Sequence, residues 1–311
     1  MSAPGARRAA AASLCVLLAG GCAGFPAPAT GGAAGGAAGE AMAGGAAAGG
    51  TLPVRGIRSD ETWRGEVRVR GSVVVQKGAT LTIMPGTVVR FEKIDVDGDG
   101  IGDSELYIEG ELAAEGTRER PIVFTSAEKD PAPRDWKYLF INLSPRAVLA
   151  HCVSEYAFSG VQIHFSRASV SGCTFRRNVD GLRFSTAEGE FTRNVMTGNV
   201  YGVRYEERGS KVILTRNDIT GNKVGIFCVT ESPGRIAIRE NRIHGNADYD
   251  FKLGNRQRTD IPARENWWGS ADAAAIRARI FDRRMEPDLG AVLFEPFLSA
   301  PPPGPDVGGG S

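Results

Sequence analysis

One pattern recurs three times in this chain, as CTFRRNVDGLRF (residues 173–184), NVMTGNVYGVRY (194–205) and NDITGNKVGIFC (217–228). Each copy has Asn or Cys at position one, Asn at position six, Gly at position nine and bulky side chains at positions ten and twelve. Related segments begin at residues 152, 241 and 266, which gives a period of 21 to 25 residues. Self-similarity at such a period is the signature of a solenoid, in which each repeat packs on its neighbours.

The apolar residues of each repeat alternate with other residues, and this alternation predicts β-strands. Side chains two positions apart point to the same face of a strand, and the repeats place apolar pairs at this spacing: Val161 with Ile163, Leu182 with Phe184, Val203 with Tyr205, Ile226 with Cys228, and Phe251 with Leu253. A strand, a turn, a second strand and a turn use roughly 22 residues, and successive coils then stack about 4.8 Å apart. We therefore expect an all-β fold, a single-stranded right-handed parallel β-helix of about ten coils over residues 53–298, because parallel crossovers are almost always right-handed.

Two columns of asparagine run along the repeats. Amide side chains at equivalent positions bond their own turn and the coils above and below, which predicts stacked ladders. The first ladder comprises Asn178, Asn199, Asn222 and Asn246, and the second Asn194, Asn217, Asn241 and Asn266. We expect a glycine column to permit turns with positive φ, at Gly160, Gly181, Gly202 and Gly225. Cys152 and Cys173 continue the second ladder one coil apart, which leaves open a disulfide or a pair of buried thiols.

The N-terminal half is less regular, but it carries specific phrases. Apolar and polar residues alternate over residues 71–75, 79–91, 105–112 and 121–126. The chain also contains GATLTIMPGT (78–87), RPIVFTS (120–126), Asp135-Trp136 and NWWG (266–269). These phrases resemble those of bacterial exported right-handed parallel β-helix repeat proteins of lipoprotein type, over residues 60–298. The resemblance implies the fold and a location outside the cytoplasm. It implies no single activity, because such proteins include lyases, hydrolases, adhesins and metal-delivery helpers.

The C-terminal end of the solenoid needs a cap, because the last coil otherwise exposes its core and unpaired strand edges. We expect a helix within Ser270–Met285, with Ile276 and Ile280 on its apolar face, and a closing strand over residues 290–294. Trp267 and Trp268 are then packing residues of the cap. Residues 299–311 are rich in Pro and Gly, so a disordered tail is expected there.

The N-terminus has the pattern of a bacterial lipoprotein signal. Arg7 and Arg8 precede an apolar run over residues 9–19, and small residues lead to Cys22. We expect residues 1–21 to be a signal peptide, Cys22 to carry a lipid, and the Ala- and Gly-rich residues 22–52 to form a flexible tether. This predicts an exported protein anchored in the outer membrane through its lipid, with simple secretion as the alternative. The formal net charge of +1 gives no global electrostatic case for binding nucleic acid.

The segment DVDGDGIGD (95–103) spaces its oxygen atoms as a calcium loop does. Positions 1, 3, 5 and 9 are carboxylates, position 6 is Gly, and position 7 offers a carbonyl, in the manner of EF-hand loops. Position 12, where a bidentate glutamate is usual, is Leu106. The flanking segments are predicted strands, so the ion would pin a long turn. The expected Ca²⁺ ligands are Asp95, Asp97, Asp99, Asp103 and the carbonyl of Ile101.

Function is less constrained than fold by this sequence. Arg183 and Arg204 occupy the outward position between the apolar pair in neighbouring coils, as a solvated edge or as the floor of a shallow groove for an acidic glycan. The pattern places no carboxylate pair across adjacent coils at the separation of about 5 to 9.5 Å that glycosidases need. We therefore expect a non-catalytic binding or structural module with glycan as the preferred ligand class. The alternatives are an envelope scaffold or protein-interaction module, and a polysaccharide lyase or hydrolase.

Overall fold

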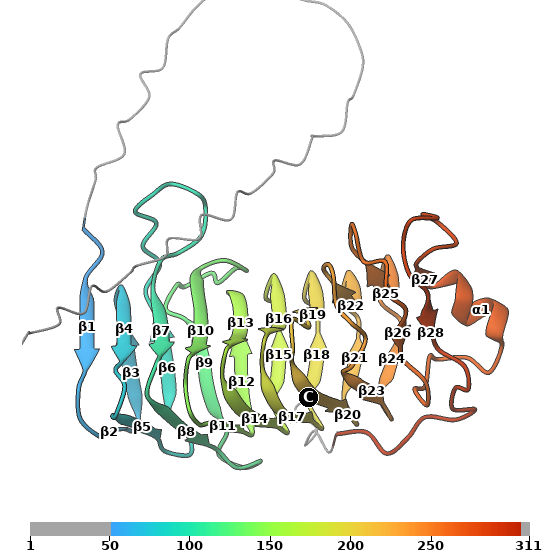
Figure 1. The fold of residues 1–311 in the computed structure, drawn as a ribbon. Helices are drawn as coiled ribbons and strands as arrows, with labels where there is room; N and C mark the ends of the chain where they lie inside the picture. Colours follow the sequence, from blue (N-terminus) through green and yellow to red (C-terminus); the bar gives the residue numbers. More distant parts are fainter. Residues whose placement is uncertain (1–50, 306–311) are drawn as a thin grey trace, which may run out of the picture. The chain divides into compact units, whose positions relative to one another are not determined.

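The computed structural model describes residues 51–305, which wind into a parallel β-helix (Figure 1). Neighbouring strands of the three long sheets pair in parallel and differ by three in sequence order, apart from the last pair of one sheet, whose strands differ by two. That topology arises when one chain winds repeatedly round one axis. The right-handed parallel β-helix expected from the repeats is confirmed. Each coil contains three strands where two were expected, because the chain bends at a third corner.

The sheets, named A, B and C here, run the length of the described solenoid. Sheet A contains β1 (Val54–Ile57), β4 (Ser72–Val75), β7 (Glu105–Ile108), β10 (Trp136–Asn142), β13 (Ala157–His164), β16 (Asp180–Ser185), β19 (Tyr201–Glu206), β22 (Val224–Cys228), β25 (Tyr249–Leu253) and β27 (Ile280–Phe281). Sheet B contains β2 (Glu61–Trp63), β5 (Thr80–Ile83), β8 (Glu111–Glu115), β11 (Ala147–Ala150), β14 (Arg167–Ser171), β17 (Glu188–Thr192), β20 (Lys211–Thr215) and β23 (Ala237–Arg239). Sheet C contains β3 (Glu66–Val69), β6 (Val88–Phe91), β9 (Ile122–Ser126), β12 (Cys152–Glu155), β15 (Thr174–Arg176), β18 (Val195–Thr197), β21 (Asp218–Thr220) and β24 (Arg242–His244).

The corners of the coils are made by residues with positive φ. Between sheets A and B the left-handed residues include Leu143, Phe165, Thr186, Arg208 and Glu231. Between sheets B and C they include His151, Gly172, Arg193, Arg216, Glu240 and Glu265. Between sheets C and A they include Tyr156, Arg177, Gly198, Gly221, Gly245 and Gly269. Most of these residues are not glycine, so each costs conformational energy that the surrounding stack must offset.

Both asparagine columns form hydrogen-bonded ladders. In the second ladder, Oδ1 of Asn217 accepts from the backbone N–H (2.9 Å) and the Nδ2 (3.0 Å) of Asn194 one coil earlier. Its own Nδ2 donates to Oδ1 of Asn241 and to the carbonyl of Phe191, both at 2.9 Å. Each amide therefore ties neighbouring coils together. The first ladder ends where Nδ2 of Asn246 donates to Oδ1 of Asp250 at 2.8 Å.

The two cysteines of the second ladder are free, buried thiols. The backbone N–H of Cys173 donates to Oδ1 of Asn194 at 2.9 Å, and the backbone N–H of Cys152 donates to Sγ of Cys173 at 3.4 Å. Burial, with the Cys173 thiol next to it, raises the pKa of Cys152 well above its usual value. The cysteines thus extend the ladder with sulfur in place of an amide oxygen.

The glycine column serves close packing, and the expected positive φ at these positions is wrong. Gly160, Gly181, Gly202 and Gly225 lie within strands of sheet A, and none is among the residues with positive φ. A Cβ at Gly202 would lie 2.7 Å from the carbonyl oxygen of Gly225 and 2.9 Å from Nδ2 of Asn222. The absent side chain makes room for the amide ladder and for the next coil.

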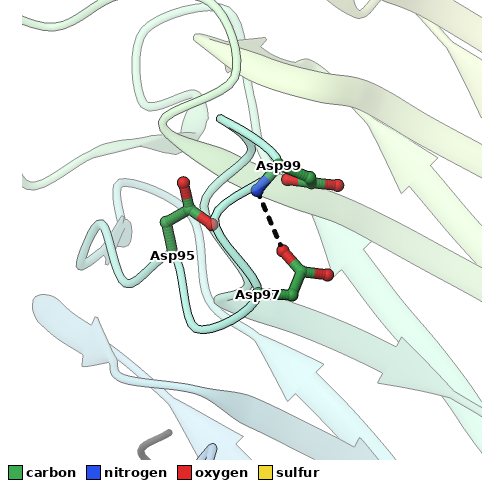
Figure 2. A group of neighbouring side chains, drawn as sticks. All are labelled: Asp95, Asp97 and Asp99. Atoms are coloured by element: carbon green, nitrogen blue, oxygen red, sulfur yellow. Dashed lines mark hydrogen bonds between the residues drawn. The ribbon is translucent and has the colours of Figure 1, made fainter. Parts of the chain in front are cut away.

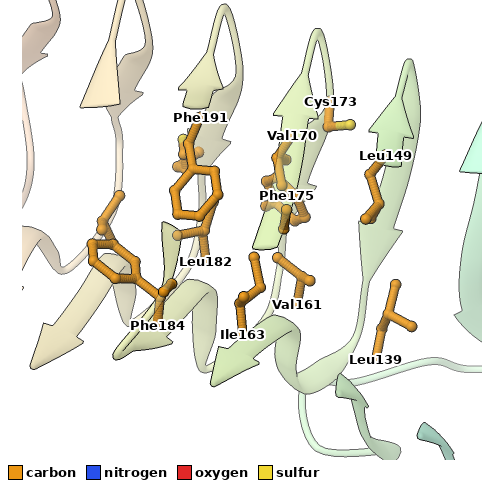
Figure 3. Packing of buried hydrophobic residues seen from close by; sticks show 14 of the residues in the cluster. Leu139, Leu149, Val161, Ile163, Val170, Cys173, Phe175, Leu182, Phe184 and Phe191 are labelled. Carbon is orange, nitrogen blue, oxygen red and sulfur yellow. The ribbon is translucent and has the colours of Figure 1, made fainter. Parts of the chain in front are cut away.

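The core consists of stacked columns of side chains inside the coils (Figure 3). Phe175, Met196, Ile219 and Ile243 pair in register across sheet C and are fully buried. Near the N-terminal end, the rings of Phe91 and Trp136 stack with their centroids 4.0 Å apart. Because each column runs through successive coils, the interior is one continuous hydrophobic core.

The C-terminal cap has a shorter helix than expected. Helix α1 (Ala273–Ala278) begins at Asp272, whose side chain accepts from the backbone N–H of Ala274. It ends early because Ile280 leaves the helix to pair with Phe251 in sheet A. The closing strand β28 (Val292–Leu293) pairs with β26 (Ile261–Pro262), and buried Trp268 packs against Phe294 as expected. No helix in residues 51–305 is long and apolar enough to cross a membrane.

The tail expected to be disordered is described as far as residue 305, and that part contacts sheet C. Arg242 donates two hydrogen bonds to the carbonyl of Pro302, at 2.9 and 2.8 Å. Sequence composition favoured disorder because Pro and Gly offer little apolar surface, but a backbone carbonyl is enough for an arginine partner.

Replacing Asn217 by alanine should lower the free energy of unfolding by about 2 to 4 kcal/mol, because it leaves buried donors and acceptors on two neighbouring coils without partners. Chemical denaturation followed by circular dichroism measures the change. Asn255→Ala is the matched control, since Asn255 is exposed in a turn. Equal stability of the two variants would show that the ladder contributes nothing beyond chain connectivity.

The substitution Gly202→Ala should cost about 1 to 3 kcal/mol of stability, the usual penalty for forcing atoms into a filled interior. Gly56→Ala is the control, because its new Cβ would meet only the ends of two flexible side chains, at 3.0 Å from Nε2 of Gln76 and 3.8 Å from Nε of Arg58. Thermal melts of both variants test the close-packing explanation. It fails if Gly202→Ala melts at the temperature of Gly56→Ala.

Candidate functional site

The outward face of sheet A carries one continuous row of large side chains, which we name the axial row. Strand register places its members on successive coils. All are half-buried except Gln162, which is buried. In order from β7 to β27 the axial row is Tyr107, Phe140, Gln162, Arg183, Arg204, Phe227, Lys252 and Phe281. Aromatic, amide and cationic groups thus line a single face, where each projects from a rigid strand.

Arg183 and Arg204, the ligand-face residues predicted from the sequence, lie next to each other across β16 and β19. Each places Nη1 at 3.6 Å from the same carboxylate oxygen, Oδ2 of Asp180. The Asp180 side chain is fully buried, whereas the two arginine side chains keep 26% and 25% of their surface exposed. Both arginines therefore pair with Asp180 through the guanidinium group and keep about a quarter of the side-chain surface exposed.

The carboxylate of Asp180 is incompletely satisfied. Ser159 donates to its Oδ2 at 3.4 Å, but Oδ1 has no hydrogen-bond partner among the described residues, and neither has Nε of Arg204. Burial raises the pKa of Asp180, against the opposing effect of Arg204 and Arg183. Burial and the neighbouring Arg204 likewise lower the pKa of Arg183. Buried polar atoms without partners are rare in native proteins and call for an explanation.

Aromatic rings flank the arginine pair on its C-terminal side. Tyr201 and Phe227 stack with their centroids 5.0 Å apart and their planes 21° apart. The guanidinium of Arg204 lies 5.6 Å from the Tyr201 ring and 5.9 Å from the Phe227 ring, within cation–π range. These rings restrict the orientation of Arg204 without using its hydrogen-bond donors.

A second aromatic group lies on the N-terminal side. Phe140 is in edge contact with Tyr107, Tyr138 and His164, with centroids 5.0, 5.1 and 5.1 Å apart. Burial lowers the pKa of His164 to about 4, and Arg183 adds to the effect. His164 is therefore neutral at neutral pH. Burial also raises the pKa of Tyr138, so its hydroxyl stays protonated.

Asp180, Tyr138, Phe140 and Tyr201 are candidate site residues that sequence reasoning missed. Two of them carried a signal. Asp180 and Tyr201 occupy position eight of the repeat, immediately before the column glycine and three residues before Arg183 and Arg204. The alignment of Phe140 with the outward residues of later coils could not be recognised from the sequence, because β10 and β13 pair through a register shift.

The aspartate loop, residues 95–103, lies at the corner between sheets C and A, between β6 and β7. Carboxylate oxygens of the exposed residues Asp95, Asp97 and Asp99 lie within 4.8 Å of one another (Figure 2). Asp103 lies deeper, where it accepts from the backbone N–H of Val96 (2.8 Å) and pairs with Nζ of Lys137 (3.3 Å). Ile101 donates its backbone N–H to Oδ1 of Asp99. The structure thus groups three of the predicted ligands, and calcium binding stays a prediction.

Calorimetric titration of calcium-stripped protein tests this prediction. We expect heat of binding and a rise in melting temperature, worth about 1.4 kcal/mol at a calcium concentration ten times Kd. The double variant Asp97→Asn/Asp99→Asn should lose both effects. Asp130→Asn, an exposed carboxylate elsewhere, should keep them. Absence of heat and of any melting shift in the unmodified protein would remove the loop from the metal sites.

Two models of protein families match overlapping parts of the chain. A pectate-lyase-like β-helix domain matches residues 57–149, and a right-handed β-helix region matches residues 141–271. The protein is a right-handed parallel β-helix repeat protein. The chain is also 40% identical over 67 residues to Protein bark beetle of Drosophila melanogaster. That segment is 21% of this chain and only 2% of the relative's length, and no solved structure matches the chain.

The predicted signal peptide, the lipid site at Cys22 and most of the tether lie outside the described residues. They stay predictions from the sequence.

Proposed function

We propose that this protein is a lipid-anchored β-helix of the cell envelope that binds glycan, without catalysis, on the outward face of sheet A. One observation carries the proposal: the partly exposed Arg183 and Arg204 both pair with a buried, incompletely satisfied Asp180, between two aromatic groups. Sugars present hydroxyl groups to charged and amide side chains and apolar ring faces to aromatic rings. Binding sites typically combine such apolar surfaces with a few fixed polar groups.

The face is better suited to binding than to hydrolysis. Glycoside hydrolases need two carboxyl groups about 5 to 9.5 Å apart that reach the substrate. Asp180 is buried beneath the arginines, and Glu206 is paired with Arg208 at 2.8 Å. The pectate-lyase-like match keeps a polysaccharide lyase as the second candidate. An envelope scaffold or protein-interaction module is the other alternative, since the same face would also fit an acidic protein.

The test is binding to a glycan array by the unmodified protein and by Arg183→Gln/Arg204→Gln. Loss of charge-assisted hydrogen bonds should weaken binding at least about tenfold. The double variant leaves the buried carboxylate of Asp180 without its cationic partners, which could destabilise the fold. The triple variant Asp180→Asn/Arg183→Gln/Arg204→Gln therefore tests the loss of the same two guanidinium groups with the buried charge also removed. Arg146→Gln/Arg167→Gln is the control, because these arginines are exposed and lie at the starts of two sheet B strands, β11 and β14.

Each outcome discriminates between the candidates. Glycan binding that both arginine variants lose and the control keeps supports the proposal. Absence of binding to any glycan, together with loss of an envelope assembly in a strain lacking the protein, favours a scaffold. New ultraviolet absorbance from unsaturated sugar ends on incubation with uronic-acid polymers identifies a lyase.

A further inference from the structure

The segments that follow the strands of sheet A become longer toward the C-terminal end of the solenoid. After β16 and β19 the chain reaches its next strand through residues 186–187 and 207–210, whereas after β22 and β25 it uses residues 229–236 and 254–260. The two longer segments enclose a cavity of about 330 Å³. Its lining residues are Glu231, Arg256, Arg258 and Thr259. The cavity therefore uses no residue of the axial row.

Reciprocal hydrogen bonds hold the two longer segments together. The backbone N–H of Ser232 donates to Oε1 of Gln257 at 2.6 Å, and Nε2 of Gln257 donates to the carbonyl of Ser232 at 2.8 Å. Both residues are fully buried. A Cβ at Gly234 would lie 2.5 Å from the carbonyl oxygen of Asp260, so the segments are also closely packed there. Buried polar groups that satisfy one another make a structure rigid, and the walls of the cavity are fixed in this way.

The side chains beside these buried residues are exposed and carry unpaired charges. Glu231 precedes Ser232, and Arg256 and Arg258 stand on either side of Gln257. Among residues 51–305, the three charged side chains make no ion pair and no hydrogen bond. They line one cavity without pairing with each other, which leaves the space between them for a ligand.

The acidic side chain that follows Thr259 does not neutralise these arginines. Asp260 pairs with Arg283 and accepts from the backbone N–H of Ala291 at 2.9 Å. The lining residues thus contribute two positive charges and one negative charge, together with the hydroxyl of Thr259.

This set of groups determines which ligand would bind. A guanidinium group binds a carboxylate or a phosphate through paired N–H bonds, so Arg256 and Arg258 suit an anionic group with several oxygens. The carboxylate of Glu231 repels an anion but attracts an ammonium group. A molecule that carries both charges satisfies all three side chains, whereas a simple anion or a simple amine leaves one of them opposed.

We propose that this cavity binds a small zwitterion, with its carboxylate or phosphate group against Arg256 and Arg258 and its ammonium group against Glu231. Free amino acids and phosphoethanolamine groups share this chemistry. Pockets for small molecules begin at about 300 Å³, so the cavity holds one such molecule or the end of a longer one. The inference is independent of glycan binding, because the two sites share no residue.

Titration calorimetry on the intact protein tests the inference with O-phosphoethanolamine and L-alanine. Ethyl phosphate and propionate are the matched probes, because each lacks only the amine. Low ionic strength is needed, since salt screens exposed charges. Each zwitterion that binds should bind at least about tenfold more tightly than its matched probe, because only the zwitterion pairs with Glu231. The tighter zwitterion identifies the anionic group as a phosphate or a carboxylate.

Two variants assign the binding to this cavity. Arg256→Gln/Arg258→Gln should weaken the binding of the zwitterions at least about tenfold, because the anionic group loses both partners. Glu231→Gln should weaken the zwitterions but not ethyl phosphate, since the variant lacks the opposing carboxylate. The control Arg58→Gln/Arg64→Gln removes the same charge from exposed side chains of the first coil and should bind as the unmodified protein does. Thermal melts check that each variant is folded.

The outcomes separate this inference from the proposed function. If neither zwitterion binds, or if Arg256→Gln/Arg258→Gln binds as the unmodified protein does, the inference is wrong and glycan binding is unaffected. An equal loss in the control variant attributes binding to net charge and also contradicts the inference. Equal affinity for O-phosphoethanolamine and ethyl phosphate, and for L-alanine and propionate, contradicts the role of Glu231 and with it the zwitterion.

Discussion

The hydrogen-bonded register between successive coils is the constraint on which every other feature depends. A slip of one residue would turn each strand's inward side chains outward, and the axial row would then not exist. The amide ladders prevent such slips, because the side chain of Asn217 bonds the coils on both sides of it. The closely packed glycines impose the same register from sheet A, since only a position without Cβ fits beside each amide.

A rigid stack also explains how a fully buried carboxylate is tolerated at Asp180. Burying a charge with few hydrogen bonds is costly, and the raised pKa of Asp180 expresses that cost. Because its pKa in the folded state is raised, the neutral carboxyl favours folding at acidic pH, and this contribution is lost as pH rises through the folded-state value. The two arginines offset part of the cost, and about a quarter of each arginine side chain stays exposed. Unsatisfied groups held by a rigid scaffold are typical of binding sites.

Sequence reasoning was strongest where one physical cause acts on every coil. The Asn column predicts its own ladder, because an amide has the same neighbours at each repeat. The number of strands per coil was not predicted correctly. The third bend is made by residues such as Arg193 and Arg216, and the residue type arginine gives no indication of a positive φ. The role of Gly202 was also misassigned, because a sequence shows a missing side chain but not the atom that fills its space. Asp180 was visible as a residue but not as the partner of both arginines, which only the register reveals.

The two longest turns of the N-terminal half lie at the same corner, between sheets C and A, and connect to each other. Nζ of Lys93 donates to Asp135 at 3.1 Å, and the N–H of Gly102 donates to the carbonyl of Arg134 at 2.8 Å. Lys137 then bridges from the base of the aspartate loop to the outward face of sheet A, because it pairs with Asp103 and lies 5.8 Å from the Tyr138 ring. The insertions therefore support the end of sheet A where the aromatic group lies. An ion held by Asp95, Asp97 and Asp99 would stiffen the same support, so the predicted metal site and the proposed glycan-binding face depend on one set of contacts.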